Sequence, residues 1–443
     1  MYFQAQPRIL ILDLGDVLFH WTTSALTALS PSTFHAVVLS PTWGELECGN
    51  ISEDVALKLI GEELSLDPEK IREAISQCRK TLSVDLDLIA DLAKLKEEMK
   101  GTLKIYAMTN IARDDFTRLK ATLSGWSLFD GEYTHVLERL DSPNPKSAIF
   151  VDDKVVNVTA AQSFGMQGIV FESAGALMRE LRNLLFDPVM RARQYMAAHA
   201  HEHHSQLEDG KQIRDSFSQF LIYDELHDVS IISLSPATAS AMEIRKEITH
   251  ATTEAKTWNY FIGPPWGTTS TFPDDVDDTA YALLSFSPPA ASANPILDRF
   301  LVNRHSRDGL VQIYFDKTRP RVCPTVLVNV VRVFYHYKRG SDVRKELQHV
   351  GNVLLNRGYV NGAAQYLSAE PFLFFFARLV EANPDEGEIQ YLRAPLMLRL
   401  RERVGRHDDS FAVATRVLAC QAMGVWAESD VSYLKKLQEA DGG

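Results

Sequence analysis

The sequence has few cysteines, no long apolar run and no excess of positive charge. Its four cysteines in 443 residues form no CxxC pair and no metal-binding spacing. We therefore expect small, unpaired apolar thiols in a reducing cytoplasm. No run of about 18 uncharged apolar residues occurs, which predicts that no helix spans a membrane. The net charge of −12 argues against nucleic acid as a partner.

The N-terminal segment also lacks the basic and apolar stretches of a secretory signal, so we expect a cytoplasmic protein. An acidic protein can still bind a phosphorylated substrate if it carries a local basic cluster. The sequence has such a cluster in one short segment, Lys317, Arg319 and Arg321. Its spacing allows either a phosphate-binding role or a solvated basic turn.

Up to about residue 186 short apolar runs alternate with helical patterns such as residues 86–99. This alternation predicts a parallel sheet with helices on both faces, in which the chemistry lies at the carboxyl ends of the strands. The expected strands are residues 8–12, 103–108, 148–151 and 168–171.

From about residue 186 onward the pattern becomes amphipathic and helical, with long helices expected at 326–337 and 343–356. The apolar run 371–377 is typical of a buried helix. The histidine-rich segment 197–210 fits no metal-ligand spacing, and we expect a solvated polar stretch there. The sequence therefore predicts two domains, residues 1–185 and 186–443.

Polar side chains follow three of the expected strands. Asp13 follows the first strand, Thr109 and Asn110 the second, and Asp152 and Asp153 the third. Because the strands are parallel, these side chains are expected in one crevice, where buried charges must be paired or used. Carboxylates around a shared point suit Mg²⁺, and one of them can act as a nucleophile. The alternative is a set of solvated acidic turns.

These segments resemble the motifs of the haloacid dehalogenase superfamily over residues 7–185. The resemblance rests on Leu12–Leu18, Ala107–Asn110 and Ile149–Val158. It implies that Asp13 is the nucleophile, that Asp13 and Asp153 hold Mg²⁺, and that Thr109 and Asn110 hold phosphate.

Two departures from this family matter. Gly15 stands where its phosphatases usually carry a general acid/base aspartate. The segment that normally carries the third-motif lysine is also missing, and Lys146 is a poor substitute. We therefore predict a weak phosphatase or none.

A second acidic cluster lies at residues 274–278, with four aspartates in five positions before an apolar run. Acidic residues in a first helical turn are common, because free N–H groups favour them. Here the flanking residues are aromatic, which indicates a dry cavity. Crowded carboxylates in such a cavity cannot all ionise, so one retains its proton and becomes an acid able to protonate an alkene.

The segment Asp275–Ala280 resembles the DxDD motif of class II terpene cyclases. This resemblance implies that Asp277 donates the proton, while Asp275 and Asp278 orient and tune it. Trp258 and Phe272 are the aromatic residues that we expect to contact the substrate. The cluster of Lys317, Arg319 and Arg321 would then tether a diphosphate, unless it is only a solvated turn.

The order of the two domains resembles that of drimane-type sesquiterpene synthases. It implies a haloacid dehalogenase-like α/β domain followed by an all-α cyclase domain of the α/α-barrel type. It also implies cyclisation of farnesyl diphosphate to a bicyclic product, with Mg²⁺ as cofactor. That group more often carries Asp-x-Asp-Thr-Thr, whereas this chain has Asp-x-Asp-Asp-Thr at residues 275–279.

Two other interpretations remain open. The chain could be a Mg²⁺-dependent phosphatase of an isoprenoid diphosphate, with a non-catalytic helical domain. It could also be a scaffold in which neither domain is catalytic. The sequence does not determine the oligomeric state, the substrate chain length or the product isomer.

Overall fold

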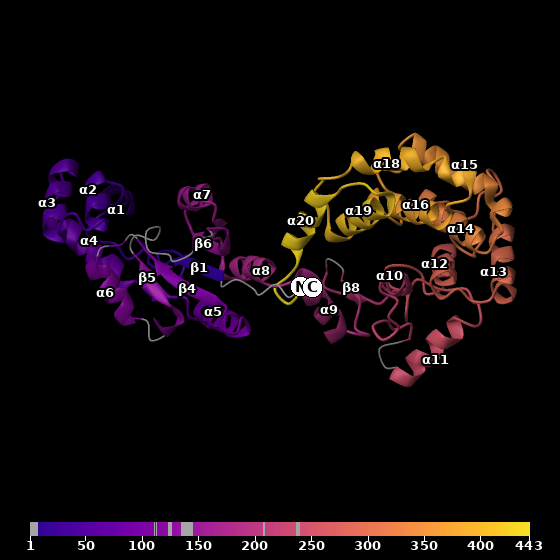
Figure 1. The fold of residues 1–443 in the computed structure, drawn as a ribbon, viewed down its shortest axis with the longest axis horizontal. Coiled ribbons are helices and arrows are strands. Elements are labelled where there is room, and N and C mark those ends of the chain that lie inside the picture. Colours follow the sequence, from indigo (N-terminus) through magenta and orange to yellow (C-terminus); the bar gives the residue numbers. More distant parts are fainter. Residues whose placement is uncertain are drawn as a thin grey trace. The chain divides into compact units, whose positions relative to one another are not determined.

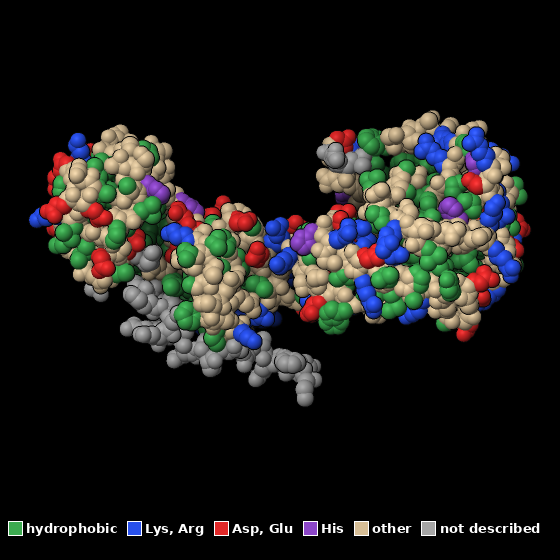
Figure 2. All heavy atoms as spheres, turned by 90° about the horizontal axis from the view of Figure 1, so that it is seen from above, with side chains coloured by type: hydrophobic (Ala, Val, Ile, Leu, Met, Phe, Trp, Pro, Cys, Tyr) green, Lys and Arg blue, Asp and Glu red, His purple; other side chains and the backbone are tan. Residues whose placement is uncertain are grey.

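The computed structural model describes residues 8–109, 111, 113–122, 126–133, 145–206, 209–235 and 240–443. The chain divides into two compact units, Met1–Leu185 and Phe186–Gly443, whose elements are labelled in Figure 1. Figure 2 shows acidic and basic side chains interspersed over the visible face of each unit. Within the described ranges, no helix has both the length and the apolar character needed to cross a bilayer.

The first unit contains a five-stranded sheet in the order β5-β4-β1-β6-β7. All neighbouring strands are parallel. The strands are β1 (Arg8–Asp13), β4 (Leu103–Met108), β5 (Gly131–Tyr133), β6 (Ala148–Asp152) and β7 (Gln167–Val170). The predicted α/β class is confirmed, and the four expected strands occur within one residue of their expected bounds. The short edge strand β5 was not predicted.

Helices connect these strands, as expected for parallel pairing. Helix α5 (Leu86–Glu98) precedes β4, α6 (Arg113–Thr122) precedes β5, and α7 (Val155–Ser163) connects β6 to β7. Helix α8 (Ala174–Leu185) follows β7. Central strand β1 is apolar between Arg8 and Asp13, with Leu10, Ile11 and Leu12 fully buried. Because β1 lies between β4 and β6, its last residue is close to the ends of both neighbours.

Between β1 and α5 the chain inserts a helical subdomain that the sequence analysis did not predict. It comprises α1 (Pro31–Val38), α2 (Pro41–Glu47), α3 (Glu53–Leu64) and α4 (Pro68–Lys80), with its own apolar core. Each of these helices is capped by a Ser or Asp side chain, and three begin with proline, a pattern typical of helix starts. The antiparallel pair β2 (Phe19–His20) and β3 (Ser83–Val84) closes this insertion.

The second unit is largely helical, as predicted. An inner row packs in succession: α10 (Ser216–Leu226), α12 (Val276–Phe286), α14 (Pro324–His336), α16 (Glu370–Ala382) and α19 (Ser410–Met423). Figure 1 shows an outer row around it, which includes α13 (Ala290–Val302), α15 (Arg344–Leu355) and α18 (Arg393–Arg401). The apolar run 371–377 is buried within α16, as expected.

The remaining elements of this unit are α9 (Pro188–Ala198), α11 (Ala241–Ala251), α17 (Gly387–Gln390) and α20 (Glu428–Leu437), with the two-residue strands β8 (Ser205–Gln206) and β9 (Gln212–Ile213). The histidine-rich segment is less solvated than expected. His199, His201 and His203 are half-buried, and the first two direct Nδ1 at backbone carbonyl oxygens. Among the described residues, none of these histidines belongs to a cluster able to hold a metal.

Candidate functional sites

Three carboxylates meet at the carboxyl edge of the sheet. Asp13 ends β1, Asp152 ends β6, and Asp153 follows it. The register aligns Asp13 with Met108, so Thr109, which is buried, follows at the same edge. Oxygen atoms of the three carboxylates lie within 4.8 Å of one another. Asn110 lies outside the described residues.

The three carboxylates differ in what satisfies them. Asp152 accepts hydrogen bonds from Asn157 Nδ2 at 3.1 and 2.9 Å and from the Lys154 N–H at 2.8 Å. Asp153 Oδ1 is buried without a hydrogen-bond partner among the described residues. Burial, followed by the charge of Asp152, raises the pKa of Asp13 to about 7, and burial also raises the pKa of Asp153.

This arrangement fits a divalent cation. An unsatisfied buried oxygen and a cluster of hard oxygen ligands are what Mg²⁺ requires. Asp13 and Asp153 were predicted as ligands, and Asp152, which was expected in the same crevice, lies in the cluster with them.

Gly15 lies beside Asp13 but supplies no acid/base group. A Cβ built at Gly15 would lie 3.9 Å from Asp13 Oδ2, which is ordinary van der Waals contact. The next residue, Asp16, is exposed and adopts a left-handed conformation with φ of 57°. The lysine segment of the third motif is missing between residues 133 and 136, and residues 134–144 lie outside the described residues.

The second acidic cluster lies at the start of α12, where three chain segments converge. Asp275 caps the helix by accepting the Asp278 N–H at 2.9 Å. Its own N–H donates to the Trp258 carbonyl at 3.0 Å, and the Val276 N–H donates to the Ile313 carbonyl at 2.7 Å. These backbone hydrogen bonds hold the aspartate segment in place independently of its side-chain contacts.

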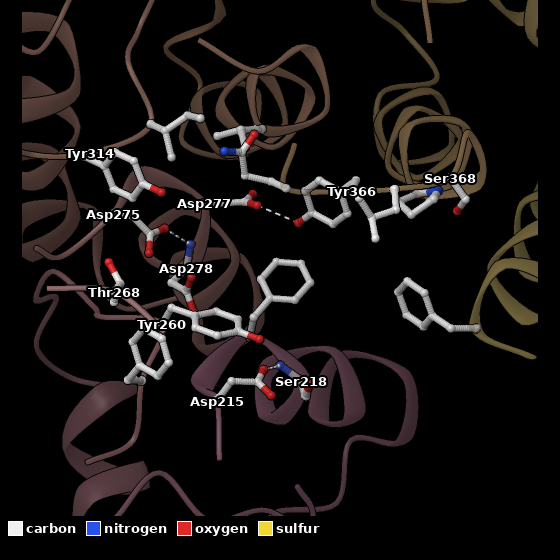
Figure 3. A pocket seen from close by; sticks show the side chains of 18 of the residues that line it. Asp215, Ser218, Tyr260, Thr268, Asp275, Asp277, Asp278, Tyr314, Tyr366 and Ser368 are labelled. Atoms are coloured by element: carbon white, nitrogen blue, oxygen red, sulfur yellow. Dashed lines mark hydrogen bonds between the residues drawn. The ribbon is translucent and has the colours of Figure 1, made fainter. Parts of the chain in front are cut away.

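The aspartates face a cavity of about 700 Å³ (Figure 3). Asp275, Asp277 and Asp278 contribute to its lining, together with aromatic, other polar and aliphatic side chains from several other segments. The aromatic lining residues are Phe217, Tyr260, Phe261, Phe272, Tyr314, Tyr366 and Phe411. No Lys or Arg is among the described lining residues, so a cation formed inside would meet carboxylates and ring faces.

Asp277 has a hydrogen-bond donor on each oxygen. Asn329 Nδ2 of α14 lies 2.8 Å from Oδ1, and the Tyr366 hydroxyl lies 2.5 Å from Oδ2. Burial raises the pKa of Asp277 and so favours its protonated form. The bonds from Asn329 and Tyr366 and the charge of Arg332 act in the opposite direction and stabilise the carboxylate form of the group.

Asp275 and Asp278 form a buried pair beside the acid. Burial raises the pKa of both carboxyl groups, and the charge of Asp275 raises the pKa of Asp278 further. The Ser216 hydroxyl donates to Asp278 Oδ1 at 2.6 Å. Because a charge on either carboxyl group disfavours ionisation of the other, the pair resists carrying two negative charges at once.

The expected substrate-contacting residues occupy different positions. Phe272 lines the cavity, whereas Trp258 lies behind it, 8% exposed and in edge contact with Phe220. Trp258 therefore supports the aspartate segment and does not line the cavity.

The basic cluster lies beside the cavity wall. Lys317 and Arg321 are exposed, and Arg319 bonds to Asp316 and Thr269. Burial raises the pKa of lining residue Tyr314, and the charges of Arg321 and Arg319 act in the opposite direction. The backbone also places Arg321 beside the wall, because its carbonyl accepts the N–H of lining residue Ile313 at 2.9 Å.

The sequence analysis assigned no role to Asn329 or Tyr366, the two partners of Asp277. One signal was available for Asn329, because it interrupts the apolar stretch 326–331 of a buried helix. A buried amide requires a partner, so it indicated a polar contact across the core. Tyr366 lies in a loop before α16, and nothing in its neighbourhood predicts the contact.

Comparison with known proteins matches both units. The model of the sesquiterpene cyclase astC-like C-terminal domain matches residues 189–337. Drimenol cyclase drtB of Aspergillus calidoustus is 35% identical over 452 aligned positions, covering 98% of this chain and 82% of the relative. Sesquiterpene phosphatase astK of Aspergillus oryzae is 34% identical over 191 positions, covering 40% of this chain and 95% of the relative.

Among solved structures, a HAD-like family hydrolase of Porphyromonas gingivalis covers 41% of this chain and 100% of its own, with 17% identity and a TM-score of 0.32. The identity of 35% to drimenol cyclase drtB extends over nearly the whole chain and joins both units in one relative. The chain therefore belongs to the family of sesquiterpene cyclases in which a haloacid dehalogenase-like domain precedes an astC-like cyclase domain.

Proposed function

We propose that the second unit cyclises farnesyl diphosphate to a bicyclic drimane-type product by protonating its distal alkene. The observation that carries this proposal is the environment of Asp277. It is a carboxyl group whose pKa is raised by burial, with a donor on each oxygen, in a cavity lined by aromatic rings. Burial favours the protonated form of such an acid, and the two donors stabilise the carboxylate that is left once the proton is given up.

The reaction consists of proton transfers and ring closures. Asp277 adds its proton to the distal alkene, which becomes a tertiary carbocation. Two ring closures then move the cation through the chain, and loss of a proton to a base restores an alkene. Aromatic faces such as those of Phe217 and Tyr260 stabilise the cation. The diphosphate is not ionised, so the net change is an isomerisation.

The cavity volume suits this substrate. About 700 Å³ falls within the range of roughly 300–1,000 Å³ that small-molecule sites occupy. Because no cation is among the described lining residues, we propose that the diphosphate lies at the wall near Tyr314. Arg319 and Arg321 bring positive charge there, and exposed Lys317 is close to them in the chain.

The test is product analysis with the full chain, farnesyl diphosphate and Mg²⁺, with and without added alkaline phosphatase before extraction. A bicyclic alcohol that appears only after phosphatase treatment supports cyclisation with the diphosphate retained. Formation of farnesol alone, with no cyclic product, contradicts the proposal.

A second candidate function is phosphate ester hydrolysis by the first unit, which the three-carboxylate cluster favours. Asp13, Asp152 and Asp153 would hold Mg²⁺, which would neutralise phosphate charge during attack by a carboxylate. We propose that this activity is weak or absent. Gly15 supplies no acid, and the expected lysine has no counterpart in the sequence. The relative named as a phosphatase makes this the specific alternative to test.

A further inference from the structure

Arg332 lies one turn after Asn329 on α14 and is buried. Its Nη1 donates to Asn329 Oδ1 at 2.8 Å, and its guanidinium lies over the rings of Tyr281 at 5.2 Å and Phe375 at 5.7 Å. Its Nη2 lies 4.0 Å from Asp224 Oδ2, which also accepts the Tyr281 hydroxyl at 3.0 Å. Rings, carboxylate and amide thus hold the guanidinium in place from three sides.

The bond to Asn329 has a chemical consequence because arginine has only donors. Arg332 can face only the oxygen of the Asn329 amide, so the amide nitrogen must face Asp277. Asn329 is therefore obliged to donate to Asp277 Oδ1, at 2.8 Å. Without Arg332 the amide could turn over and present its oxygen to Asp277.

The two amide orientations have opposite effects on the acid. An amide nitrogen that donates to Oδ1 stabilises the carboxylate left after proton transfer. An amide oxygen in that position would accept the acidic proton and hold it away from the substrate. The orientation of a single amide therefore decides whether Asp277 is available as a donor, and a buried cation next to that amide strengthens the bond further.

We propose that Arg332 is a positioning residue for the acid, which acts through Asn329 and not by contact with the substrate. This inference rests on the proposed role of Asp277 as proton donor. It accounts for the presence of a buried guanidinium behind a site that binds a cationic intermediate. The carboxylate of Asp224 offsets the positive charge of Arg332. The hydrogen bond from Arg332 to Asn329 fixes the orientation of the Asn329 amide.

A double-mutant cycle tests whether Arg332 acts through Asn329. The variants are Arg332→Met, Asn329→Ala and their combination, assayed for cyclic product from farnesyl diphosphate. We expect Arg332→Met to lower kcat about tenfold, with little change in KM. In the Asn329→Ala background, the same change should lower kcat less than about twofold. Independent losses that multiply in the double variant would show that Arg332 does not act through Asn329.

Arg339→Met is the matched control. Arg339 stacks over Phe334 at 5.5 Å, pairs with Asp298 at 2.7 Å and donates to Asn294 Oδ1 at 3.5 Å. Within the described part of the chain, none of its hydrogen bonds or ion pairs reaches Asp275, Asp277 or Asp278. Its loss should affect melting temperature as Arg332→Met does and leave kcat unchanged. Equal kcat in Arg332→Met and Arg339→Met would overturn the inference.

Arg332→Lys keeps the test valid if Arg332→Met does not fold, because lysine retains the charge and a donor. We expect a kcat above that of Asn329→Ala, because lysine, like arginine, can face only the amide oxygen of Asn329. A kcat as low as that of Asn329→Ala would overturn the inference. Asp277→Asn separates this inference from the proposed function. If Asp277→Asn is inactive while Arg332→Met is fully active, only the role of Arg332 fails. If Asp277→Asn cyclises normally, the proposed function fails.

Discussion

Each unit contains a cluster of three aspartates, and the two clusters differ in the hydrogen bonds and side chains that surround them. At the sheet edge, Asp153 retains an unsatisfied oxygen, and the cluster is suited to a divalent cation. At the start of α12, Asp277 has a donor on each oxygen and lies in an aromatic cavity. We propose that the same residue type serves as a metal ligand in one unit and as a proton donor in the other. Burial raises pKa values in both clusters, so the difference lies in the unsatisfied oxygen of Asp153 and in the aromatic cavity around Asp277.

The largest expected effect is the loss of cyclisation when Asp277 is replaced, with no such loss when Asp13 is replaced. Asp277→Asn removes the acidic proton but keeps the shape, and we expect cyclisation to fall about 10⁴-fold. The melting temperature should change little. Product formation is measured by extraction after phosphatase treatment. Asp13→Asn serves as the control in the other cluster, and loss of cyclisation in that variant would break the comparison.

Gly15→Asp should increase the phosphatase activity of the cluster formed by Asp13, Asp152 and Asp153. The position accepts a side chain, because a Cβ there meets only Asp13 Oδ2 at 3.9 Å. A carboxyl group beside the nucleophile supplies general acid/base chemistry, so we expect phosphate release from p-nitrophenyl phosphate with Mg²⁺ to rise about 10²-fold.

Gly15→Asn is the control, because it matches the shape without the acid. Wild-type turnover as fast as that of Gly15→Asp would contradict the proposed weakness of this site.

Tyr366→Phe removes the donor to Asp277 Oδ2. The carboxylate left after proton transfer loses one hydrogen bond, and we expect kcat for cyclisation to fall about tenfold. Tyr359→Phe is the matched control, since its ring stacks on Phe372 at 5.2 Å. Identical turnover in the two variants would show that the bond to Tyr366 does not assist the acid.

The smallest expected effect concerns the basic cluster. Arg321→Gln removes one charge near the proposed diphosphate position, so we expect KM to rise about three- to tenfold with kcat unchanged. Steady-state kinetics with farnesyl diphosphate measure both constants. Arg307→Gln, at another exposed arginine, should change neither. An unchanged KM in Arg321→Gln would leave the cluster as a solvated basic turn.

The sequence predicted the position of those site residues whose place depends on their immediate neighbours in the chain. Asp13 and Asp153 follow apolar strands, so their convergence was predictable from the parallel sheet. The aspartate cluster at 274–278 was also recognisable, because its members are neighbours in sequence at the start of one helix. The helical subdomain α1–α4 was not predicted, although its capping residues are visible in the sequence.

The partners of Asp277 could not be predicted in this way. Asn329 and Tyr366 are 52 and 89 residues away in sequence, and only the packing of α12, α14 and the loop before α16 brings them to one carboxyl group. For Trp258 the sequence predicted a contact with the cavity that the structure does not have. Its aromatic character indicated a cavity wall, but its backbone pairs with Asp275 and its ring packs behind the aspartates.

The central claim is that a proton from Asp277 starts the reaction, and the most direct test is cyclisation of farnesyl diphosphate in D₂O. The Asp277 carboxyl exchanges with solvent between turnovers. We predict a cyclic product that retains its diphosphate and carries one solvent deuterium on the carbon that Asp277 protonates. A cyclic product without solvent deuterium, formed with release of inorganic diphosphate, would show that ionisation starts the reaction and would contradict this account.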